Sequence, residues 1–184
     1  MSKPVLYYPI GLPGCGKTTY LSKLDNLSIV CADLIREELF GHIDTQYSDE
    51  YLESMGYPVS SMSVRDKIFT CNEIVWNEVN RRLLDLGKEG RDAANDGTHL
   101  EEKYRRNVLE KFSPLFTVHA LYFDVPLETC IERDRLRQNH NVGEKKIRDM
   151  NRKFDLPRIE EGFDVLETLD LDGNRLALLR RENE

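Results

Sequence analysis

The sequence predicts an α/β fold in which a parallel β-sheet is covered by helices on both faces. Short apolar runs rich in β-forming residues alternate along the chain with longer segments of helical period. The length of 184 residues suits a single domain with one core, spanning residues 1–184. Hydrophobic residues make up 40% and charged residues 32% of the chain, a composition typical of a globular protein and too apolar for a disordered one.

Five segments have the character of strands. Residues 5–10 form a short apolar run rich in β-forming residues and predict a buried strand, which ends at the following glycine. Residues 116–123 have the clearest strand pattern, whereas residues 91–96 are predicted from their context, since Asp-Ala-Ala-Asn has little β preference. Alternation over residues 165–171 predicts a last strand at the edge of the sheet. The predicted strands are residues 5–10, 28–32, 91–96, 116–123 and 165–171.

The helices are predicted from their apolar period and their end signals. A stripe of apolar residues predicts one long helix that ends at Gly87. The spacing from Thr98 to Glu101 is that of a capping box and predicts a helix that opens there. Residues 41–62 have no clear period and are predicted as a loop or irregular insertion. The predicted helices are residues 18–27, 34–40, 68–86, 98–112, 127–137 and 144–154.

Cysteine usage and hydropathy exclude several classes of protein. The cysteines are scattered without a CxxC pair, which excludes a zinc knuckle or a dense disulfide framework and fits a reducing cytosol. No apolar run approaches the roughly 20 residues that a membrane-spanning helix needs. Residues 1–14 lack the pattern of a secretory signal peptide. We therefore expect a cytoplasmic protein with no membrane partner, and the sequence points to no protein partner.

The charge is distributed unevenly. A net charge of -7 disfavours general, charge-driven binding to nucleic acid. Residues 131–158 nevertheless carry nine Lys or Arg against five Asp or Glu, a local balance of +4. This stretch is either a local basic patch or an ordinary solvated helix face.

Residues 11–18, Gly-Leu-Pro-Gly-Cys-Gly-Lys-Thr, match the P-loop pattern G-x-x-x-x-G-K-[ST], between a predicted strand and a predicted helix. The glycines let backbone N–H groups face phosphate oxygens, and the helix adds the positive end of its dipole. Lys17 is expected to bind the β- and γ-phosphates and Thr18 to coordinate Mg²⁺. The alternative is a plain glycine turn. The predicted ATP-binding residues are Gly11, Gly14, Cys15 at a variable position of the motif, Gly16, Lys17, Thr18 and Thr19.

Asp33 follows the second predicted strand, at the end of the sheet where doubly wound enzymes bind their ligands. There it would serve as a general base on an acceptor hydroxyl. Arg36 lies one helical turn later on the same face and would bind an anion. The alternative is that Asp33 is simply the N-cap of the next helix. The spacing alone does not separate the two.

Asp96 ends the third predicted strand, the usual place of the second carboxylate of a P-loop site, which holds Mg²⁺ or its waters. We assign Asp96 and Thr98 to the substrate-binding residues. The alternatives are a turn aspartate before glycine and a helix-capping threonine. We expect His99 on a helix surface rather than as a ligand, and Trp76 in the packing of the long helix rather than as a platform for base stacking.

Arg133 and Arg137 lie four residues apart on one face of the helix that follows the fourth strand. A basic helix, a flexible joint and a further helix suggest a lid over residues 131–157 that closes over phosphates. Charge on a transferring phosphoryl group needs such cationic donors. The alternative is a set of surface arginines paired with Glu132 and Asp134.

Five segments between about Val5 and about Asp164 carry a family resemblance. They are GLPGCGKTT, ADLIRE, NDGTHLEEKYRR, YFDVPLETCIERDRLRQ, and VGEKKIRDMNRKFDLP followed by EEGFD. In this order they resemble the P-loop kinases of the polynucleotide 5′-hydroxyl kinase type, including the phage end-healing enzymes, and more distantly the zeta-toxin-like kinases. The resemblance implies a P-loop NTPase fold with a five-stranded parallel sheet of order 2-3-1-4-5 and a helical lid.

The resemblance implies an ATP- and Mg²⁺-dependent phosphotransferase that acts on a hydroxyl, first of all the 5′-hydroxyl end of a polynucleotide. It gives Asp33 the role of general base and Arg36 a contact with an acceptor phosphate. Arg137 would stabilise the transferring phosphate, and Arg133 would bind ATP beside it. The alternatives are a kinase of a small molecule, such as a nucleoside, sugar or antibiotic, and a non-catalytic ATP-binding switch.

Two features depart from the family pattern. The third strand is poorer in apolar residues than is usual. Gly97-Thr98-His99 stands where Ala-Thr-Asn is more common.

Overall fold

The computed structural model describes residues 2–138 and 140–182. These residues include a six-stranded sheet of order β2-β3-β1-β4-β5-β6. β1 pairs in parallel with β3 and β4, and β4 pairs in parallel with β5. The predicted α/β class and the strand order 2-3-1-4-5 are therefore confirmed. The strands are β1 (Val5–Ile10), β2 (Ser28–Cys31), β3 (Ala93–Asp96), β4 (Thr117–Phe123), β5 (Val165–Leu169) and β6 (Arg175–Arg180).

The sheet has one strand more than predicted. β6 pairs antiparallel with β5, so the strand predicted for the sheet edge lies inside the sheet. The chain reverses after Leu169, where the Asp170 carboxylate accepts hydrogen bonds from the N–H groups of Asp172 and Asn174. Gly173 adopts a φ of 84° in this turn. The Asp-Gly-Asn sequence between two apolar runs was the signal for this hairpin.

Helices occupy most of the remaining chain. Residues 41–62 are not an irregular loop as predicted, because they contain α3, whose N-cap Ser48 accepts a hydrogen bond from Tyr51 N. Leu52, Val59 and Cys71 form a small buried cluster that holds this segment. The helices are α1 (Lys17–Leu21), α2 (Ala32–Phe40), α3 (Asp49–Ser54), α4 (Val64–Lys88), α5 (Glu102–Phe112), α6 (Leu127–Arg135) and α7 (Glu144–Arg152), with short 3-10 turns η1 (Val59–Ser61) and η2 (Ile159–Glu161).

Three predicted helix ends were wrong. The helix after the P-loop ends at Leu21 rather than at residue 27, and α4 continues past Gly87. The capping box at Thr98 does not form, because α5 begins at Glu102. The Asp155 carboxylate, from a distant segment, accepts the hydrogen bond of Glu102 N at 3.0 Å. A tertiary contact thus sets the start of α5.

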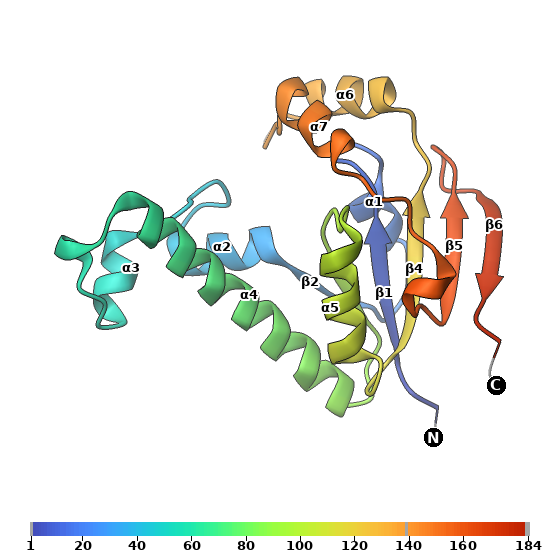
Figure 1. The fold of residues 1–184 in the computed structure, drawn as a ribbon, viewed down its shortest axis with the longest axis horizontal. Coiled ribbons are helices and arrows are strands. Elements are labelled where there is room, and N and C mark those ends of the chain that lie inside the picture. Colours follow the sequence, from blue (N-terminus) through green and yellow to red (C-terminus); the bar gives the residue numbers. More distant parts are fainter. Residues whose placement is uncertain (1, 139, 183–184) are drawn as a thin grey trace. The chain divides into compact units, whose positions relative to one another are not determined.

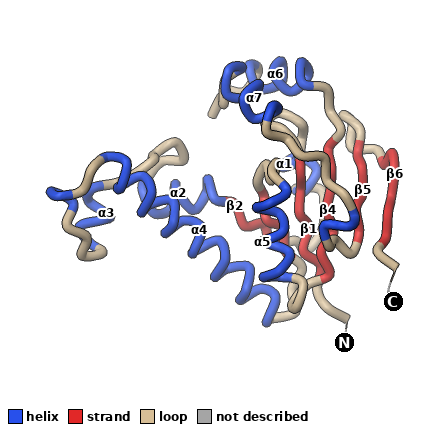
Figure 2. The backbone as a smooth tube through the Cα atoms, viewed as in Figure 1, coloured by secondary structure: helices blue, strands red, loops and turns tan. Residues whose placement is uncertain are grey.

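The chain divides into two compact units. We call Met1–Ile29 with Leu84–Glu184 the sheet unit and Val30–Leu83 the helical unit. In the sheet unit, Leu12 and Cys15 of the P-loop share a buried cluster with Phe123 of β4 and Ile147 of α7. In Figure 1 the arrows of β1, β4 and β5 point toward the side on which α6 and α7 lie. Figure 2 colours the helices, α6 and α7 among them, in blue and the strands in red.

None of the helices in the described part of the chain combines the length and the apolar character needed to cross a membrane.

Candidate nucleotide-binding site

The loop between β1 and α1 depends on glycine at two positions for different reasons. Gly14 has a φ of 86°, and a Cβ there would lie 2.3 Å from the carbonyl oxygen of Cys130 in α6. Gly16 has a φ of 102°, but a Cβ there would meet only the Arg133 guanidinium, at 4.0 Å. Close packing and backbone conformation both require glycine at Gly14, while conformation alone requires it at Gly16. The same contact places Arg133 beside the P-loop.

The ammonium group of Lys17 is held by the loop itself. Lys17 is 8% exposed, and its Nζ donates to the carbonyl oxygens of Gly11 at 2.9 Å and Leu12 at 2.8 Å. Gly11 N donates in turn to the carbonyl oxygen of Thr98 at 3.0 Å, which joins the P-loop to the turn after β3. The Nζ also lies 3.5 Å from the Cys15 sulfur. A cation held by two carbonyls and a sulfur can exchange them for the stronger charged acceptors of a phosphate.

Thr18 and Asp96 meet where the prediction places the metal. Thr18 Oγ1 donates to Asp96 Oδ2 at 2.8 Å, and Asp96, at the end of β3, is buried. A hydroxyl and a carboxylate supply the hard oxygen ligands that Mg²⁺ prefers. Among the residues described, no group of three or more His, Cys, Asp or Glu could hold a metal ion. A protein-bound Mg²⁺ commonly uses one or two protein oxygens and completes its shell with substrate phosphates and water.

The arginines of the predicted lid occupy different surroundings. Arg133 donates from Nη2 to the carbonyl oxygen of Leu171 at 3.1 Å. Arg137 lies 3.6 Å from Asp134 Oδ1, and its side chain is 41% exposed. The carboxylate of Asp134 is buried and accepts hydrogen bonds from Val142 N and Gly143 N in the loop before α7. Arg137 thus has the acidic partner that the surface alternative requires, and that partner also anchors the α6–α7 loop.

His99 is not the helix-surface residue that we predicted. Its ring stacks on Tyr8 of β1 with centroids 4.0 Å apart, and its Nε2 lies 2.9 Å from the carbonyl oxygen of Asn95. Burial of the ring lowers the pKa of His99 to about 4, the nearby Lys17 and Arg105 charges acting in the same direction. A Cβ on Gly97 would lie 2.8 Å from this ring, so the position of the His99 ring leaves room only for glycine at residue 97.

Sequence reasoning missed a buried ion pair behind the site. The Arg105 guanidinium donates to both carboxylate oxygens of Glu161 at 2.7 and 2.8 Å, and both side chains are 0% exposed. The same guanidinium donates to the carbonyl oxygens of Leu100 at 2.7 Å and His99 at 3.2 Å. It therefore ties the turn after Asp96 to η2, beyond α7. No local sequence signal marks a pair separated by 56 positions.

Asp33 and Arg36 pair with each other in the helical unit. Arg36 Nη1 donates to Asp33 Oδ1 at 2.8 Å, and Arg36 Nη2 donates to Asn72 Oδ1 at 3.0 Å. The side chain of Asp33 is 60% exposed and that of Arg36 is 19% exposed. α2 begins at Ala32 with Cys31 as its N-cap, so the alternative that Asp33 caps this helix is wrong.

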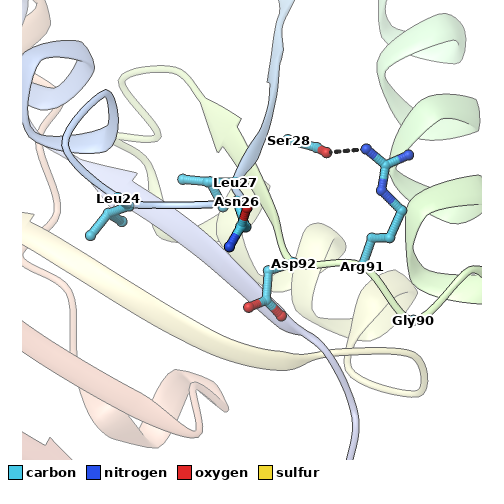
Figure 3. A pocket seen from close by; sticks show the side chains of 7 residues that line it. All are labelled: Leu24, Asn26, Leu27, Ser28, Gly90, Arg91 and Asp92. Atoms are coloured by element: carbon cyan, nitrogen blue, oxygen red, sulfur yellow. Dashed lines mark hydrogen bonds between the residues drawn. The ribbon is translucent and has the colours of Figure 1, made fainter.

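A separate hollow of about 660 Å³ lies at the amino ends of β2 and β3. Arg91 Nη2 donates to Ser28 Oγ at 2.8 Å across it (Figure 3). Asp92 Oδ1 accepts the hydrogen bond of Val5 N at 2.7 Å. Its lining residues lie before these strands or, for Ser28, at the first residue of β2, whereas the P-loop follows β1. The hollow is therefore distinct from the nucleotide site. The lining residues are Leu24, Asn26, Leu27, Ser28, Gly90, Arg91 and Asp92.

Several known proteins are similar to this chain. "Transcription factor bHLH140" of Arabidopsis thaliana is 26% identical over 106 residues, which cover 50% of this chain and 12% of that protein. A chain of the Pnkp1/Rnl/Hen1 RNA repair complex is 20% identical with a TM-score of 0.57, over 86% of this chain and 49% of that one. A sugar kinase from Janibacter sp. HTCC2649 is 20% identical with a TM-score of 0.55, over 94% of this chain and 87% of that one.

The chain thus spans about half of the RNA repair chain and a small part of the plant protein. The structural likenesses establish a kinase-like P-loop fold. The model of the AAA domain family AAA_33 matches residues 6–157, which is most of the chain. The protein therefore belongs to this AAA domain family.

Proposed function

We propose that this protein is an Mg²⁺- and ATP-dependent phosphotransferase that moves the γ-phosphate of ATP to a hydroxyl, and that its acceptor is the 5′-hydroxyl end of a polynucleotide. The observation that carries the proposal is the Thr18–Asp96 hydrogen bond of 2.8 Å beside the buried Lys17. Lys17 and Thr18 open α1 and Asp96 ends β3, so a cation and two metal-binding oxygens from separate elements converge where a phosphate–magnesium complex would bind.

The phosphate donor is assigned to the sheet unit. The N–H groups of the P-loop and the Nζ of Lys17 bind the β- and γ-phosphates, and Thr18 and Asp96 hold the magnesium ion or its waters. Magnesium, when bound, neutralises charge on the phosphate oxygens. Arg133, beside Gly16, binds the same phosphates from α6. In this role Lys17 exchanges the carbonyl oxygens of Gly11 and Leu12 for phosphate oxygens.

The acceptor is assigned to the helical unit. The exposed carboxylate of Asp33 accepts the proton of the acceptor hydroxyl, whose oxygen bonds to the γ-phosphorus while the bond from phosphorus to ADP breaks. Arg36, oriented by Asp33 and Asn72, binds the phosphate next to the terminal nucleoside. A simple sugar or an uncharged nucleoside offers no anion to such a group, which favours a polynucleotide.

The lid is assigned to residues 131–157. Arg137 is half-exposed, and its contact with Asp134 is 3.6 Å long. Such an ion pair is weak, so a phosphate can replace Asp134 as the partner of Arg137. A cation that approaches the transferring group only on closure stabilises the transition state more than the bound substrate.

A kinase of a small molecule is the second candidate. The match to the sugar kinase covers 87% of that protein, whereas the match to the RNA repair chain covers 49% of it. A sugar kinase of similar length therefore provides the fuller match. The same donor site would serve this reaction, and only the acceptor would differ.

The test is transfer of labelled phosphate from γ-labelled ATP to a panel of acceptors. The panel holds a 5′-hydroxyl oligoribonucleotide, the matching oligodeoxyribonucleotide, nucleosides and sugars, with Lys17→Ala as the inactive control. We expect labelled oligonucleotide that a 5′-phosphatase can strip. Label on a sugar or nucleoside alone would favour the second candidate. ATP binding without label on any acceptor would support a non-catalytic switch.

A further inference from the structure

The helical unit carries two large aromatic side chains that its core does not bury. Phe69 is 63% exposed and Trp76 is 44% exposed, although the neighbouring Cys71, Val75 and Val79 of α4 are buried. Trp76 is therefore not a packing residue, contrary to the prediction. Single exposed apolar residues are common on protein surfaces, so their positions decide whether they matter.

Phe69 and Trp76 flank the residue that orients Arg36. They lie seven positions apart in α4, which is two helical turns and roughly 10 Å along the axis, and so share one face. Asn72 lies between them, three positions after Phe69 and four before Trp76, on the same face. Its side-chain oxygen accepts the hydrogen bond of Arg36 Nη2 at 3.0 Å.

A continuous series of contacts thus leads from Asp33 to the aromatic face. Asp33 binds Arg36 at 2.8 Å, Arg36 binds Asn72, and an exposed ring stands one turn away on each side of Asn72. All five residues belong to the helical unit. The proposed base, the proposed phosphate-binding group and two exposed ring faces therefore lie together in one compact part of the chain.

Planar rings beside a guanidinium suit one class of ligand. Every nucleobase has a flat face that stacks on an aromatic side chain, with little dependence on sequence. The backbone phosphate between two nucleosides matches the single guanidinium of Arg36. Stacking also needs no surplus of positive charge, which agrees with a net charge of -7.

We propose that Phe69 and Trp76 form the surface on which the first bases of the acceptor strand stack. The inference rests on the proposed function, because it takes Asp33 and Arg36 as the acceptor site. It goes further by naming what the acceptor must carry, namely unpaired bases next to its 5′-hydroxyl. A sugar has no base with which to cover either ring.

The first experiment uses the fluorescence of Trp76, which is the only tryptophan in the chain. A short single-stranded 5′-hydroxyl oligonucleotide is titrated into the full-length protein without ATP. We expect saturable quenching of the emission, and weaker binding in Phe69→Ala. Emission that does not respond to the oligonucleotide would overturn the inference.

The second experiment measures transfer by variants. We expect Phe69→Ala and Trp76→Ala each to raise KM for the oligonucleotide by about 5- to 140-fold, which is the stacking range of about 1–3 kcal/mol per base at 1.4 kcal/mol per tenfold. The kcat at saturating oligonucleotide and the KM for ATP should not change. Phe69→Tyr and Trp76→Phe keep a ring and should stay near the parent. Tyr104→Ala removes a ring that is 55% exposed on α5 of the sheet unit and should have no effect.

An altered acceptor separates stacking from damage to the protein. The abasic acceptor is an oligonucleotide without bases at its first two positions. Its KM with the parent should equal the KM of the normal strand with the Phe69→Ala, Trp76→Ala double variant. The KM of the double variant should not rise further on the abasic strand, because removing the rings and removing the bases abolish the same contact. Independent, additive losses would overturn the inference.

The failures of the two proposals are distinguishable. If the parent phosphorylates oligonucleotides and the ring variants keep its KM, the stacking surface is wrong and the proposed function stands. If oligonucleotides quench Trp76 emission but only a sugar is phosphorylated, the proposed polynucleotide acceptor is wrong and the inference falls with it, because the bound strand is then no acceptor; this result differs from the first one.

Discussion

Arg105 and Glu161 form a two-point ion pair with both side chains fully buried in the sheet unit. The guanidinium also binds the carbonyl oxygens of His99 and Leu100. The Glu161 carboxylate accepts a further hydrogen bond from Arg158 N at 2.9 Å. The turn that follows Asp96 and the segment that follows α7 are thus held by one pair of charges with no access to water.

Breaking this pair should be strongly destabilising. Arg105→Leu leaves the carboxylate of Glu161 buried without its partner, and such a loss costs about 3–5 kcal/mol. The check is the free energy of unfolding from urea titration. The double variant Arg105→Leu, Glu161→Leu should recover part of the loss, because no buried charge is left alone. A single variant as stable as the parent would show that water reaches the pair.

His99 should make the protein less stable in mild acid. Its pKa is about 4 in the fold against 6.5 for an ordinary histidine, so the unfolded chain binds the proton more readily. The free energy of unfolding should therefore fall as the pH drops from about 6.5 toward 4, by up to about 3 kcal/mol in total. His99→Asn should flatten this part of the pH profile. Burial also lowers the pKa of His119, so the difference between parent and variant isolates His99.

Asp33→Asn should act on the chemical step. The amide keeps the shape of the side chain and can still accept from Arg36, but it cannot take a proton. We expect kcat to fall by about 10²- to 10⁴-fold with KM for ATP near normal. The stability should change by no more than about 1 kcal/mol, since Asp33 is no helix cap and its ion pair is exposed. Glu37→Gln, an exposed change on the same helix, is the control. An unchanged kcat would remove Asp33 from the reaction.

Arg137→Ala should lower kcat more than it raises KM for ATP. The side chain is 41% exposed and its ion pair with Asp134 is 3.6 Å long, so its removal costs little in the ground state. Arg135, which pairs with Glu144, supplies the matched variant, and Arg135→Ala should retain the activity of the parent. Equal losses in both variants would mean that the basic helix acts only through its overall charge.

The features that could be predicted are those that depend on residues close together in the chain. The P-loop could be recognised because its glycines, Lys17 and Thr18 act within one turn of chain. The strand order followed from an ordered set of family segments. The spacing of Asp33 and Arg36 already placed them on one face of a helix, and the structure joins them at 2.8 Å.

Helix starts, buried charges and enclosed rings depend on partners that are distant in the sequence, so they became visible in the folded structure alone. Asp155 sets the start of α5, and Glu161 makes Arg105 a buried charge, yet neither partner lies near its target in the sequence. The ring of His99 is enclosed because β1 brings Tyr8 against it. Trp76 is exposed although it lies in an amphipathic helix with an apolar stripe. The apolar period predicts which residues face a core, whereas exposure and ionic partners depend on which segments the fold brings together.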